Sequence, residues 1–301
     1  FTPEHMAGFF YIQEPSASSA VTILDPKPGM KVLDMCAAPG SKSTQISEML
    51  EQEGLLVANE IHPTRSRILL ENIERCGSAN TIVLNNDPKD ISKAFPEFFD
   101  MVLCDAPCSG EGMFRKEDQA VEQWSLENVQ ACALRQSYIL EEAYKCLKPG
   151  GTMVYSTCTF AIEENELCMQ KFIQEHPDMH LVPIEVDFGR KAFDLGCHTD
   201  YARRIFPMDG GEGHFIAKLQ KDVTSTESTV KLMQSQALPK EAKEFFDEFF
   251  VNQYPYYFVK NNKIYGGTQP FYEVGKCHLL RHQVFLGEME KNRFTPSHAL
   301  F

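Results

Sequence analysis

The hydrophobic positions of this 301-residue chain fall into two alternating kinds of stretch. Short apolar runs, such as 81–84 (TIVL), are typical of parallel strands that are covered on both faces. Between these runs, apolar residues recur every three to four positions, which indicates amphipathic helices. The pattern predicts strands at 31–34, 55–59, 81–84, 101–104 and 152–156, and helices at 15–24, 41–52, 61–76, 125–148 and 162–174.

The order of these segments predicts the fold class. Strands and helices alternate along most of the chain, which is the arrangement of an α/β protein with a doubly wound, mostly parallel, Rossmann-like sheet. A terminal pair of strands is predicted near 204–206 and 214–219, and a short aromatic strand at 8–13 (GFFYIQ). We therefore expect one α/β domain to span residues 1–220.

The remaining residues predict a smaller second domain. Segment 221–238 is rich in Ser and Thr and lacks apolar periodicity, so it is interpreted as a linker. Aromatic residues at 254–265, interrupted by Asn261 and Asn262, indicate a hairpin. We expect 239–301 to form a small C-terminal α/β domain. Its first helix, opened by Pro239, carries an aromatic stripe that is interpreted as core: Phe245, Phe246, Phe249 and Phe250.

Composition and charge narrow the class of protein. No apolar run approaches the length of a membrane span and no secretory signal is present, so we expect a soluble, cytoplasmic protein without a membrane partner. The ten cysteines do not follow C-x-x-C spacing, which favours reduced thiols and no metal site. The formal net charge of −13 argues against indiscriminate binding to nucleic acid. It leaves room for a local basic surface, since Lys and Arg gather at 115–116, 190–191 and 203–204 and in the tail around Lys276, Arg281, Lys291 and Arg293.

Acidic residues stand close to the ends of three successive strands: Asp34, Glu60 and Asp87. Each alone is equally suited to a turn or a helix N-cap. Their repetition at strand ends favours a cofactor that carries hydroxyl and amino groups, and the position of Glu60 suits a carboxylate that binds a ribose. The small residues between the first strand and its helix allow close approach of a nucleotide-like ligand to a helix N-terminus. An ordinary strand-to-helix turn is the alternative.

Two cysteines follow neighbouring strands of the predicted sheet. The strand at 101–104 ends at Asp105, and Cys108 follows in a loop rich in small residues; Cys158 lies just beyond the strand at 152–156. Because the carboxyl ends of parallel strands share one edge of a sheet, where ligands bind, we expect these three side chains to lie together. The alternative is a pair of buried structural thiols.

Two thiols and a carboxylate beside a nucleotide-like cofactor suit a narrow set of reactions. A thiolate can add to C6 of a pyrimidine and make C5 nucleophilic enough to take a methyl group from a sulfonium donor. A carboxylate can hydrogen-bond N3 of the base and favour its protonation as charge develops after attack, and a second group must then remove the C5 proton. Cysteine has a pKa of roughly 8.5, so the attacking thiol needs help, which the helix after Cys158 is expected to supply through its dipole. Spacing alone leaves open which cysteine attacks.

Several longer motifs resemble those of the Sun/Nop family of RNA (cytosine-5) methyltransferases, and most of all its bacterial RsmF-type members, which act on 16S rRNA. The resemblance covers nearly the whole chain. Its motifs are 9–16 (FFYIQEPS), 34–42 (DMCAAPGSK), 105–110 (DAPCSG), 155–159 (YSTCT), 204–207 (RIFP) and 291–300 (KNRFTPSHAL).

The resemblance implies a fold, a cofactor and its ligands. It implies the Rossmann-like sheet of an S-adenosylmethionine-dependent methyltransferase, with S-adenosyl-L-methionine as the cofactor. Glu60 would bind the ribose, Asp87 the adenine side, and Asp105 both cofactor and base. The loop that would hold the methionine part consists of Cys36, Ala37, Ala38, Pro39, Gly40, Ser41 and Lys42.

The resemblance also implies an activity and a partner. The chain would methylate C5 of cytosine in 16S rRNA, in the small ribosomal subunit or its precursor, through a covalent bond from Cys158 to C6. Cys108 would assist release, whereas an analogy with DNA (cytosine-5) methyltransferases would select Cys108 as the nucleophile. The chain would act as a monomer with no DNA partner, and 239–301 would be an RNA-binding, PUA-like domain.

Two departures from the family and two alternatives accompany this hypothesis. The family's N-terminal RNA-contacting segment is missing before the start at Phe1, and the PUA-like region is cut short at Phe301, so we expect a piece of a longer product. One alternative function is a non-catalytic RNA-binding ribosome-assembly factor on the same fold. A methyltransferase for a protein or small molecule is another, but it leaves the paired thiols unexplained.

Overall fold

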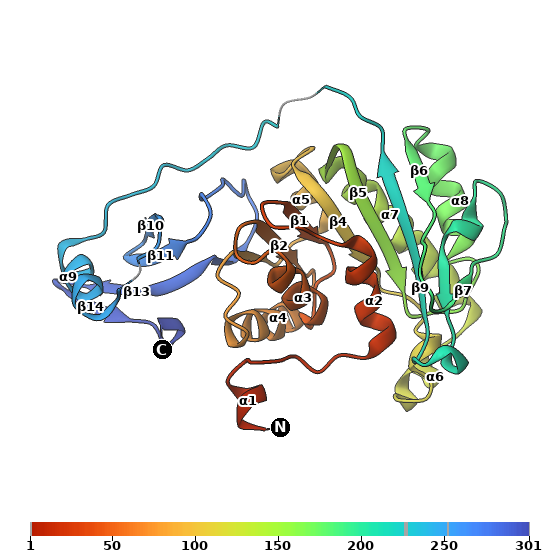
Figure 1. Cartoon of the computed structure of the whole chain (residues 1–301), viewed down its shortest axis with the longest axis horizontal. Helices are drawn as coiled ribbons and strands as arrows, with labels where there is room; N and C mark the ends of the chain where they lie inside the picture. The colour runs from red at the N-terminus through yellow and green to blue at the C-terminus, as the bar shows by residue number, and fades with distance from the viewer. Residues whose placement is uncertain (1, 226–227, 252, 301) are drawn as a thin grey trace.

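The backbone is organised around a large mixed sheet, seen in a computed structural model that describes residues 2–225, 228–251 and 253–300 (Figure 1). Within those residues the sheet has ten strands. They are β1 (Lys31–Asp34), β2 (Leu55–Asn59), β3 (Thr81–Leu84), β4 (Phe99–Asp105), β5 (Leu147–Thr157), β6 (Met179–Val182), β7 (Arg190–Lys191), β8 (Arg203–Ile205), β9 (His214–Lys221) and β12 (Leu279–His282).

The strand order confirms the predicted fold class. The sheet runs β12-β3-β2-β1-β4-β5-β9-β8-β7, and β6 also pairs with β9. Strands β3, β2, β1, β4 and β5 are parallel, while β9 runs antiparallel to β5. The chain order reverses between β1 and β4, which is the switch point where open α/β sheets bind ligands. The carboxyl ends of β1, β2, β4 and β5 therefore meet at one edge.

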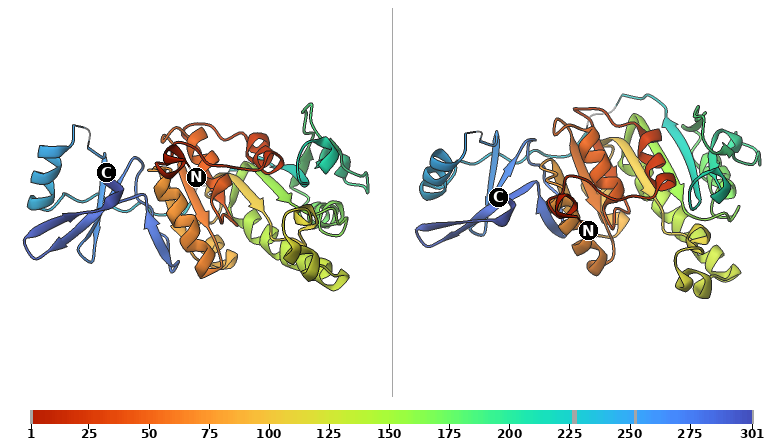
Figure 2. Two further views of the ribbon diagram at one scale, coloured as in Figure 1. Left: turned by 90° about the horizontal axis from the view of Figure 1, so that it is seen from below. Right: turned by 60° about the horizontal axis from the view of Figure 1, so that its bottom comes forward.

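Helices cover both faces of this sheet (Figure 1, Figure 2). One apolar cluster contains residues of α2 (Pro15–Leu24), α3 (Ser41–Met49) and α4 (Pro63–Arg75). The other contains residues of α5 (Pro88–Ala94), α7 (Leu126–Cys146) and α8 (Glu166–Glu175). Strand β4 contributes to both clusters, as expected of a strand buried on its two faces. The short helices are α1 (Pro3–Met6), α6 (Asp118–Gln123), η1 (Glu111–Met113), η2 (Thr199–Tyr201), η3 (Pro207–Asp209) and η4 (His298–Leu300).

The prediction of a strand at 8–13 was wrong. This segment pairs with no strand, and Phe9 is 79% exposed. Instead the Arg75 guanidinium of α4 donates to the carbonyls of His5 and Phe10, at 2.7 and 3.4 Å. Aromatic residues favour strands only where a neighbouring strand supplies hydrogen bonds, and none of the strands in the described residues pairs with 8–13.

The second sheet belongs to a C-terminal unit, by which we mean the described residues from 240 to 300. Its strands are antiparallel in the order β10-β11-β13-β14. The predicted hairpin is confirmed: β10 and β11 pair, and Asn261 and Asn262 form the turn with φ angles of 50° and 65°. The aromatic stripe is core only in part, since Phe246 is 1% exposed but Phe249 is 62% exposed. The elements of this unit are α9 (Lys240–Phe249), β10 (Tyr256–Lys260), β11 (Lys263–Gly267), β13 (Val284–Glu290) and β14 (Arg293–Pro296).

The C-terminal part of the chain also contributes to the large sheet. Strand β12 pairs antiparallel with β3, a contact that no sequence pattern predicted. The connector between the two sheets begins after β9, which continues to Lys221; the Lys221 ammonium donates to the carbonyl of Leu147 at 3.0 Å. The described residues of the connector, 222–225 and 228–239, form no helix before α9 begins (Figure 1). None of the helices in the described residues is long and apolar enough to cross a membrane.

Candidate active site

A cavity of about 790 Å³ lies at the carboxyl edge of the parallel strands. Loops after β1, β2, β3, β4 and β5 line it, together with α6 and the first half of α7. It brings together many of the residues that the sequence singled out. The predicted site residues among its lining are Cys36, Ala38, Glu60, Asp87, Asp105, Cys108 and Cys158.

The two predicted cysteines are in contact, which confirms that their loops lie side by side. The Sγ atoms of Cys108 and Cys158 are 3.3 Å apart. A hydrogen bond donated by the Cys108 thiol lowers the pKa of Cys158 against the opposing effect of burial. The same contact, together with burial, raises the pKa of Cys108 well above its usual value. The pair is therefore polarised, with Cys158 the easier thiol to ionise.

Asp105 stands beside the thiols with both carboxylate oxygens engaged. Oδ2 accepts from the Lys42 ammonium at 2.7 Å, and Oδ1 accepts from the Ser156 hydroxyl at 2.8 Å. The Nε2 atom of His214 lies 3.6 Å from Oδ1. Burial favours the neutral acid, but Lys42 and His214 together hold the pKa of Asp105 well below its usual range. Asp105 is thus an ionised acceptor.

Lys42 supplies the positive charge that we had expected from a helix dipole. Its residue is 7% exposed, and besides pairing with Asp105 its ammonium lowers the pKa of Cys158, which partly offsets the larger raising effect of the Asp105 charge. The prediction that the next helix activates Cys158 was wrong, because α8 begins only at Glu166. Dipole effects fall off within the first turn of a helix. Sequence reasoning had placed Lys42 in a cofactor loop and missed its link to Asp105.

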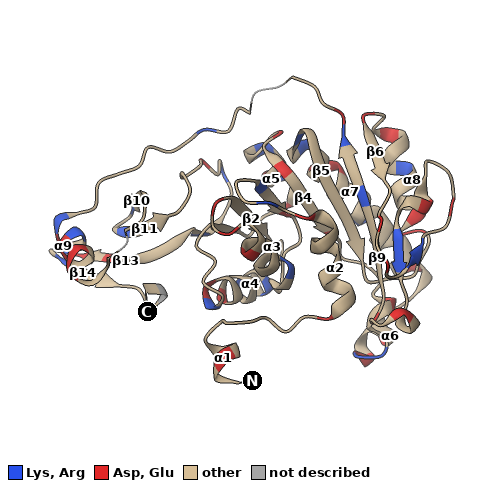
Figure 3. Ribbon diagram, in the orientation of Figure 1, with Lys and Arg blue, Asp and Glu red and all other residues tan. Residues whose placement is uncertain are grey.

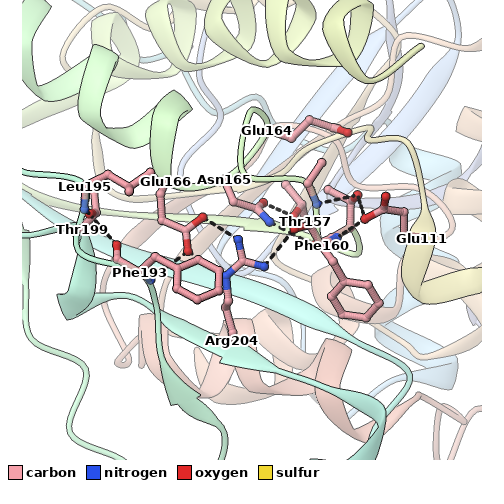
Figure 4. A network of polar contacts seen from close by, with 12 residues as sticks. Glu111, Thr157, Phe160, Glu164, Asn165, Glu166, Phe193, Leu195, Thr199 and Arg204 are labelled. Atoms are coloured by element: carbon pink, nitrogen blue, oxygen red, sulfur yellow. Dashed lines mark hydrogen bonds and ion pairs between the residues drawn. The ribbon is translucent and has the colours of Figure 1, made fainter. Parts of the chain in front are cut away.

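Glu111 fixes the loop that carries Cys158 (Figure 4). Its Oε2 accepts from the backbone N–H of Phe160 at 2.7 Å and from the Thr159 hydroxyl at 3.1 Å. Its Oε1 accepts from the indole N–H of Trp124 at 3.0 Å. The N–H of Gly112 donates to the Cys158 carbonyl at 2.8 Å, where a Cβ atom would collide with that oxygen. No sequence signal separated Glu111 from other loop carboxylates.

A second buried carboxylate fixes the Cys108 loop. Glu164 accepts from the N–H of Ser109 at 3.1 Å and from the Gln136 amide at 2.7 Å. Gln136 donates also to the Pro107 carbonyl at 3.0 Å. Burial raises the pKa of Glu164. The Cys158 loop is therefore held by the half-buried Glu111 and the Cys108 loop by the fully buried Glu164, both on the sheet's carboxyl side.

Four of the basic residues singled out in the sequence, Arg115, Lys116, Arg190 and Arg204, are committed to acidic partners. Arg204 is 2% exposed, its Nε donates to Glu166 at 2.7 Å, and its Nη1 donates to the Phe160 carbonyl at 3.0 Å (Figure 4). Figure 3 shows Lys and Arg interspersed with Asp and Glu. The remaining pairs are Arg115 and Lys116 with Glu212, and Arg190 with Asp209.

Two carboxylates, Glu60 and Asp87, line the cavity on the side of β2 and β3, away from the strands β4 and β5 that precede the two cysteines. Glu60 is 2% exposed and its Oε1 accepts from the N–H of His62 at 2.9 Å. Asp87 caps α5 by accepting from the N–H of Lys89 at 2.9 Å, and it also accepts from the Tyr138 hydroxyl. The N-cap and the cofactor interpretations of Asp87 are compatible, since it also lines the cavity.

The loop 36–42 divides between the cavity and α4. Cys36 and Ala38 line the cavity, while the Pro39 carbonyl accepts from Asn72 of α4 at 2.9 Å. Gly40 has a φ of 115°, and a Cβ there would lie 3.3 Å from atoms of Leu69 and Asn72. Glycine is thus required for packing against α4. Ala37, Pro39, Gly40, Ser41 and Lys42 are not among the residues that line the cavity.

Asp34, the first of the three strand-end acids, faces the interior. It is 1% exposed, accepts from the Ser43 hydroxyl at 2.6 Å, and is not among the cavity-lining residues. Burial raises the pKa of Asp34 to about 7. Its role is therefore to join β1 to α3.

Comparisons with known proteins agree with this geometry. Residues 21–220 match the family model of 16S rRNA methyltransferase RsmB/F, and residues 244–301 match the RsmF rRNA methyltransferase first C-terminal domain. The ribosomal RNA small subunit methyltransferase F of Vibrio cholerae serotype O1 is 43% identical over 226 residues, which are 73% of this chain and 47% of that protein. Its namesake in Escherichia coli O9:H4 is 40% identical over 224 residues, 73% of this chain and 46% of that protein.

Solved structures give the same result. A methyltransferase homolog protein from Pyrococcus horikoshii is 34% identical with a TM-score of 0.65, covering 73% of this chain and 70% of that one. NSun6 from Pyrococcus horikoshii, determined with SFG, is 31% identical with a TM-score of 0.66, covering 74% and 56%. The chain spans about half the length of the curated relatives. Because the first family model covers two thirds of the residues, the chain belongs to the RsmB/F family of 16S rRNA methyltransferases.

Proposed function

We propose that this chain transfers a methyl group from S-adenosylmethionine to C5 of a cytosine in the RNA of the small ribosomal subunit. The observation that carries the proposal is the contact of Cys158 and Cys108 at 3.3 Å, beside the ionised Asp105, in the wall of one cavity. The names of the relatives support rRNA as the substrate. The proposed C5 chemistry follows from the paired thiols.

The residues at the far end of the cavity suit S-adenosylmethionine. Carboxylates from two adjacent strand ends, Glu60 and Asp87, offer acceptors for ribose hydroxyls and for an amino group, and Ile61 and Pro88 offer apolar surface for a flat ring. Cys36 and Ala38 lie on the path from there to the thiols. When bound, the cofactor would supply an electrophilic methyl group. SFG in the similar NSun6 structure is in line with this assignment.

Cys158 is the nucleophile in this proposal. Its thiolate forms the bond to C6, and the electron pair displaced from the C5–C6 double bond makes C5 able to attack the methyl group. The lowered pKa of Cys158 and the nearby Lys42 ammonium favour the thiolate before attack. Asp105, as an acceptor, binds the amino group of the cytosine, and its negative charge favours uptake of a proton from solvent at N3 as charge develops there.

Cys108 completes the reaction. While Cys158 is a thiolate, the contact between the two sulfurs keeps Cys108 protonated. Once the Cys158 sulfur is bound to C6 it carries no charge, so Cys108 ionises more readily and accepts the C5 proton. The electrons of the C5–H bond restore the double bond, and the bond from sulfur to C6 breaks.

This assignment of the two cysteines is tested by measuring methylation of small-subunit RNA with variants in which one cysteine at a time is replaced by alanine. The full chain is incubated with small ribosomal subunits and tritiated S-adenosylmethionine, and 5-methylcytosine is quantified by mass spectrometry. Cys158→Ala should give neither product nor adduct, whereas Cys108→Ala should accumulate protein covalently bound to RNA. Cys197→Ala is the matched control, because this cysteine lies outside the cavity lining. An adduct with Cys158→Ala and none with Cys108→Ala would reverse the roles.

The assignment of the C-terminal unit as an RNA-binding element is part of the same proposal. Its support is the match of residues 244–301 to a C-terminal domain of rRNA methyltransferases. Wild-type protein that binds the subunit but leaves every cytosine unchanged would instead favour the non-catalytic assembly factor.

A further inference from the structure

The C-terminal unit joins the large sheet directly behind the cofactor end of the cavity. Strand β12 extends the sheet next to β3, with Leu279 opposite Leu84. Just beyond Leu84 the chain passes through Asn85 and Asn86 to Asp87, one of the two carboxylates assigned to the cofactor. The segment 277–282 therefore lies one strand away from the cavity wall.

Backbone groups of His278 hold the turn that follows β3. The His278 carbonyl accepts from the N–H of Asn85 at 3.0 Å and from the Asn86 side-chain amide at 3.2 Å. The His278 N–H donates to Oδ1 of Asn86 at 2.8 Å. The His278 side chain itself is exposed. The contact thus depends on the backbone at 278 and not on the imidazole.

The same turn holds the cavity wall. The Asn85 amide donates to the carbonyls of Glu60 and Ile61 at 2.7 and 2.9 Å. Asn59 exchanges two hydrogen bonds with the backbone of Asn86, at 3.0 and 3.1 Å. Asn59, Glu60 and Ile61 all line the cavity. A continuous series of hydrogen bonds therefore leads from His278 to the residues assigned to the ribose and adenine.

A second contact supports the same wall farther along. The Cys277 thiol approaches the Asp90 carbonyl of α5 at 3.5 Å. Asp87, which begins this helix, lies on the cavity side. None of the cavity-lining residues found in the described chain comes from the C-terminal unit. Any influence of this unit on the cofactor is thus transmitted through Asn85, Asn86 and α5.

We propose that docking of segment 277–282 on β3 orders the cofactor end of the cavity, so that the C-terminal unit and the cofactor site are thermodynamically coupled. His278 is the positioning residue, acting through its backbone. The inference rests on the proposed cofactor. Because binding free energies are reciprocal, cofactor binding strengthens the docking of the C-terminal unit, and a partner that draws this unit away weakens cofactor binding. RNA bound to the C-terminal unit would therefore change the affinity of the cofactor site through this coupling.

A pair of substitutions at one position tests the coupling. His278→Pro removes the N–H that donates to Asn86, whereas His278→Ala keeps the backbone and removes only an exposed side chain. Affinity for S-adenosylhomocysteine is measured by calorimetry on the full chain. Because His278→Pro loses one hydrogen bond, we expect it to bind S-adenosylhomocysteine about fivefold more weakly than wild type. The affinity of His278→Ala should equal that of wild type. In methylation assays the KM for S-adenosylmethionine should rise while kcat stays the same.

A second measurement works on the unmodified chain, and so is independent of how well the proline variant folds. Saturating S-adenosylhomocysteine should slow amide hydrogen exchange in 277–282, although no residue of that segment lines the cavity. The turn 261–262 of the C-terminal unit, remote from β3, should be unaffected and serves as the internal control. Absence of ligand-dependent protection in 277–282 would overturn the inference.

The outcomes separate this inference from the proposed function. A chain that fails to bind S-adenosylhomocysteine would refute the proposed cofactor. If His278→Pro and His278→Ala bind S-adenosylhomocysteine with the same affinity, and both have native circular dichroism, the coupling alone would be refuted. Methyl transfer through Cys158 would then stand without it.

Discussion

The two ends of the cavity are built on different principles. At the thiol end, Cys158 and Asp105 are surrounded by interior side chains, among them Lys42, whose residue is 7% exposed. At the proposed cofactor end, Glu60 accepts from the N–H of His62, which precedes α4, and Asp87 accepts from the N–H of Lys89 in α5; the turn behind them is held by the C-terminal unit. In the proposed reaction, reactivity is therefore set by side chains inside the sheet, whereas the proposed cofactor binding depends partly on the docked C-terminal unit.

The difference follows from what each end must do. A buried, paired charge acts in a low-dielectric surrounding and shifts the ionisation of its neighbours strongly. Recognition of hydroxyl and amino groups needs only acceptors at the right place. Free N–H groups at the start of a helix can hold such carboxylates by hydrogen bonds. Changes at the thiol end should thus alter kcat and its pH dependence, and changes at the cofactor end should alter KM.

The largest effect in this comparison is expected for Lys42→Met. The substitution removes the ammonium that neutralises Asp105 and that lowers the pKa of Cys158. We expect kcat to fall by about 10³-fold, because an unpaired carboxylate would remain beside the nucleophile. The pKa of Cys158 should rise, so the alkaline-rising limb of kcat should move to higher pH. An unchanged pH profile would contradict the role of Lys42, and Lys171→Met, which removes an exposed ammonium paired with an exposed carboxylate, is the control.

Asp34 and Asp105 end neighbouring strands, but the pKa of Asp34 is raised and that of Asp105 is lowered, and Asp34→Asn tests this contrast. Burial raises the pKa of Asp34 to about 7, so the folded state binds a proton that the unfolded state has lost. Its contribution to stability is complete below pH 4 and is lost as the pH rises through 7. The free energy of unfolding should therefore fall by roughly 3 kcal/mol between pH 4 and pH 8 through this group. Urea denaturation across that range should show a flatter profile for Asp34→Asn than for wild type.

Glu111→Gln tests how much the scaffold of the nucleophile loop contributes. The carboxylate accepts three hydrogen bonds from Thr159, Phe160 and Trp124, and an amide has only one oxygen to accept them. We expect kcat to fall about tenfold with KM for the cofactor unchanged. Trp124 is the sole tryptophan of the chain, so its fluorescence reports the lost contact directly. Glu122→Gln, at an exposed position, is the control and should change neither kcat nor the fluorescence of Trp124.

The sequence predicted the parts of the site that depend on strand ends. Asp105, Cys108 and Cys158 could be placed together because parallel strands deliver their following residues to one edge. The link from Lys42 to Asp105 escaped prediction, since it joins residues far apart in the chain through the direction of one side chain. Strand β12 escaped as well, because the partner that makes it a strand lies at 81–84. The wrong prediction of a strand at 8–13 has the opposite cause. Its aromatic residues favour a strand, but no described strand pairs with this segment.

The smallest effect is expected for Glu60→Gln, at the cofactor end. The amide oxygen can still accept from the N–H of His62, as the carboxylate does at 2.9 Å, so the local turn should survive. What is lost is the charge that strengthens hydrogen bonds from ribose hydroxyls, which predicts about fivefold weaker binding of S-adenosylhomocysteine. Because Glu60 is remote from the thiols in the proposed reaction, kcat at saturating cofactor should not change. Exposed Glu53→Gln is the control. A fall in kcat as large as that of Glu111→Gln would mean that the two ends of the cavity are not separable, since ordering at Glu60 would then reach Cys158.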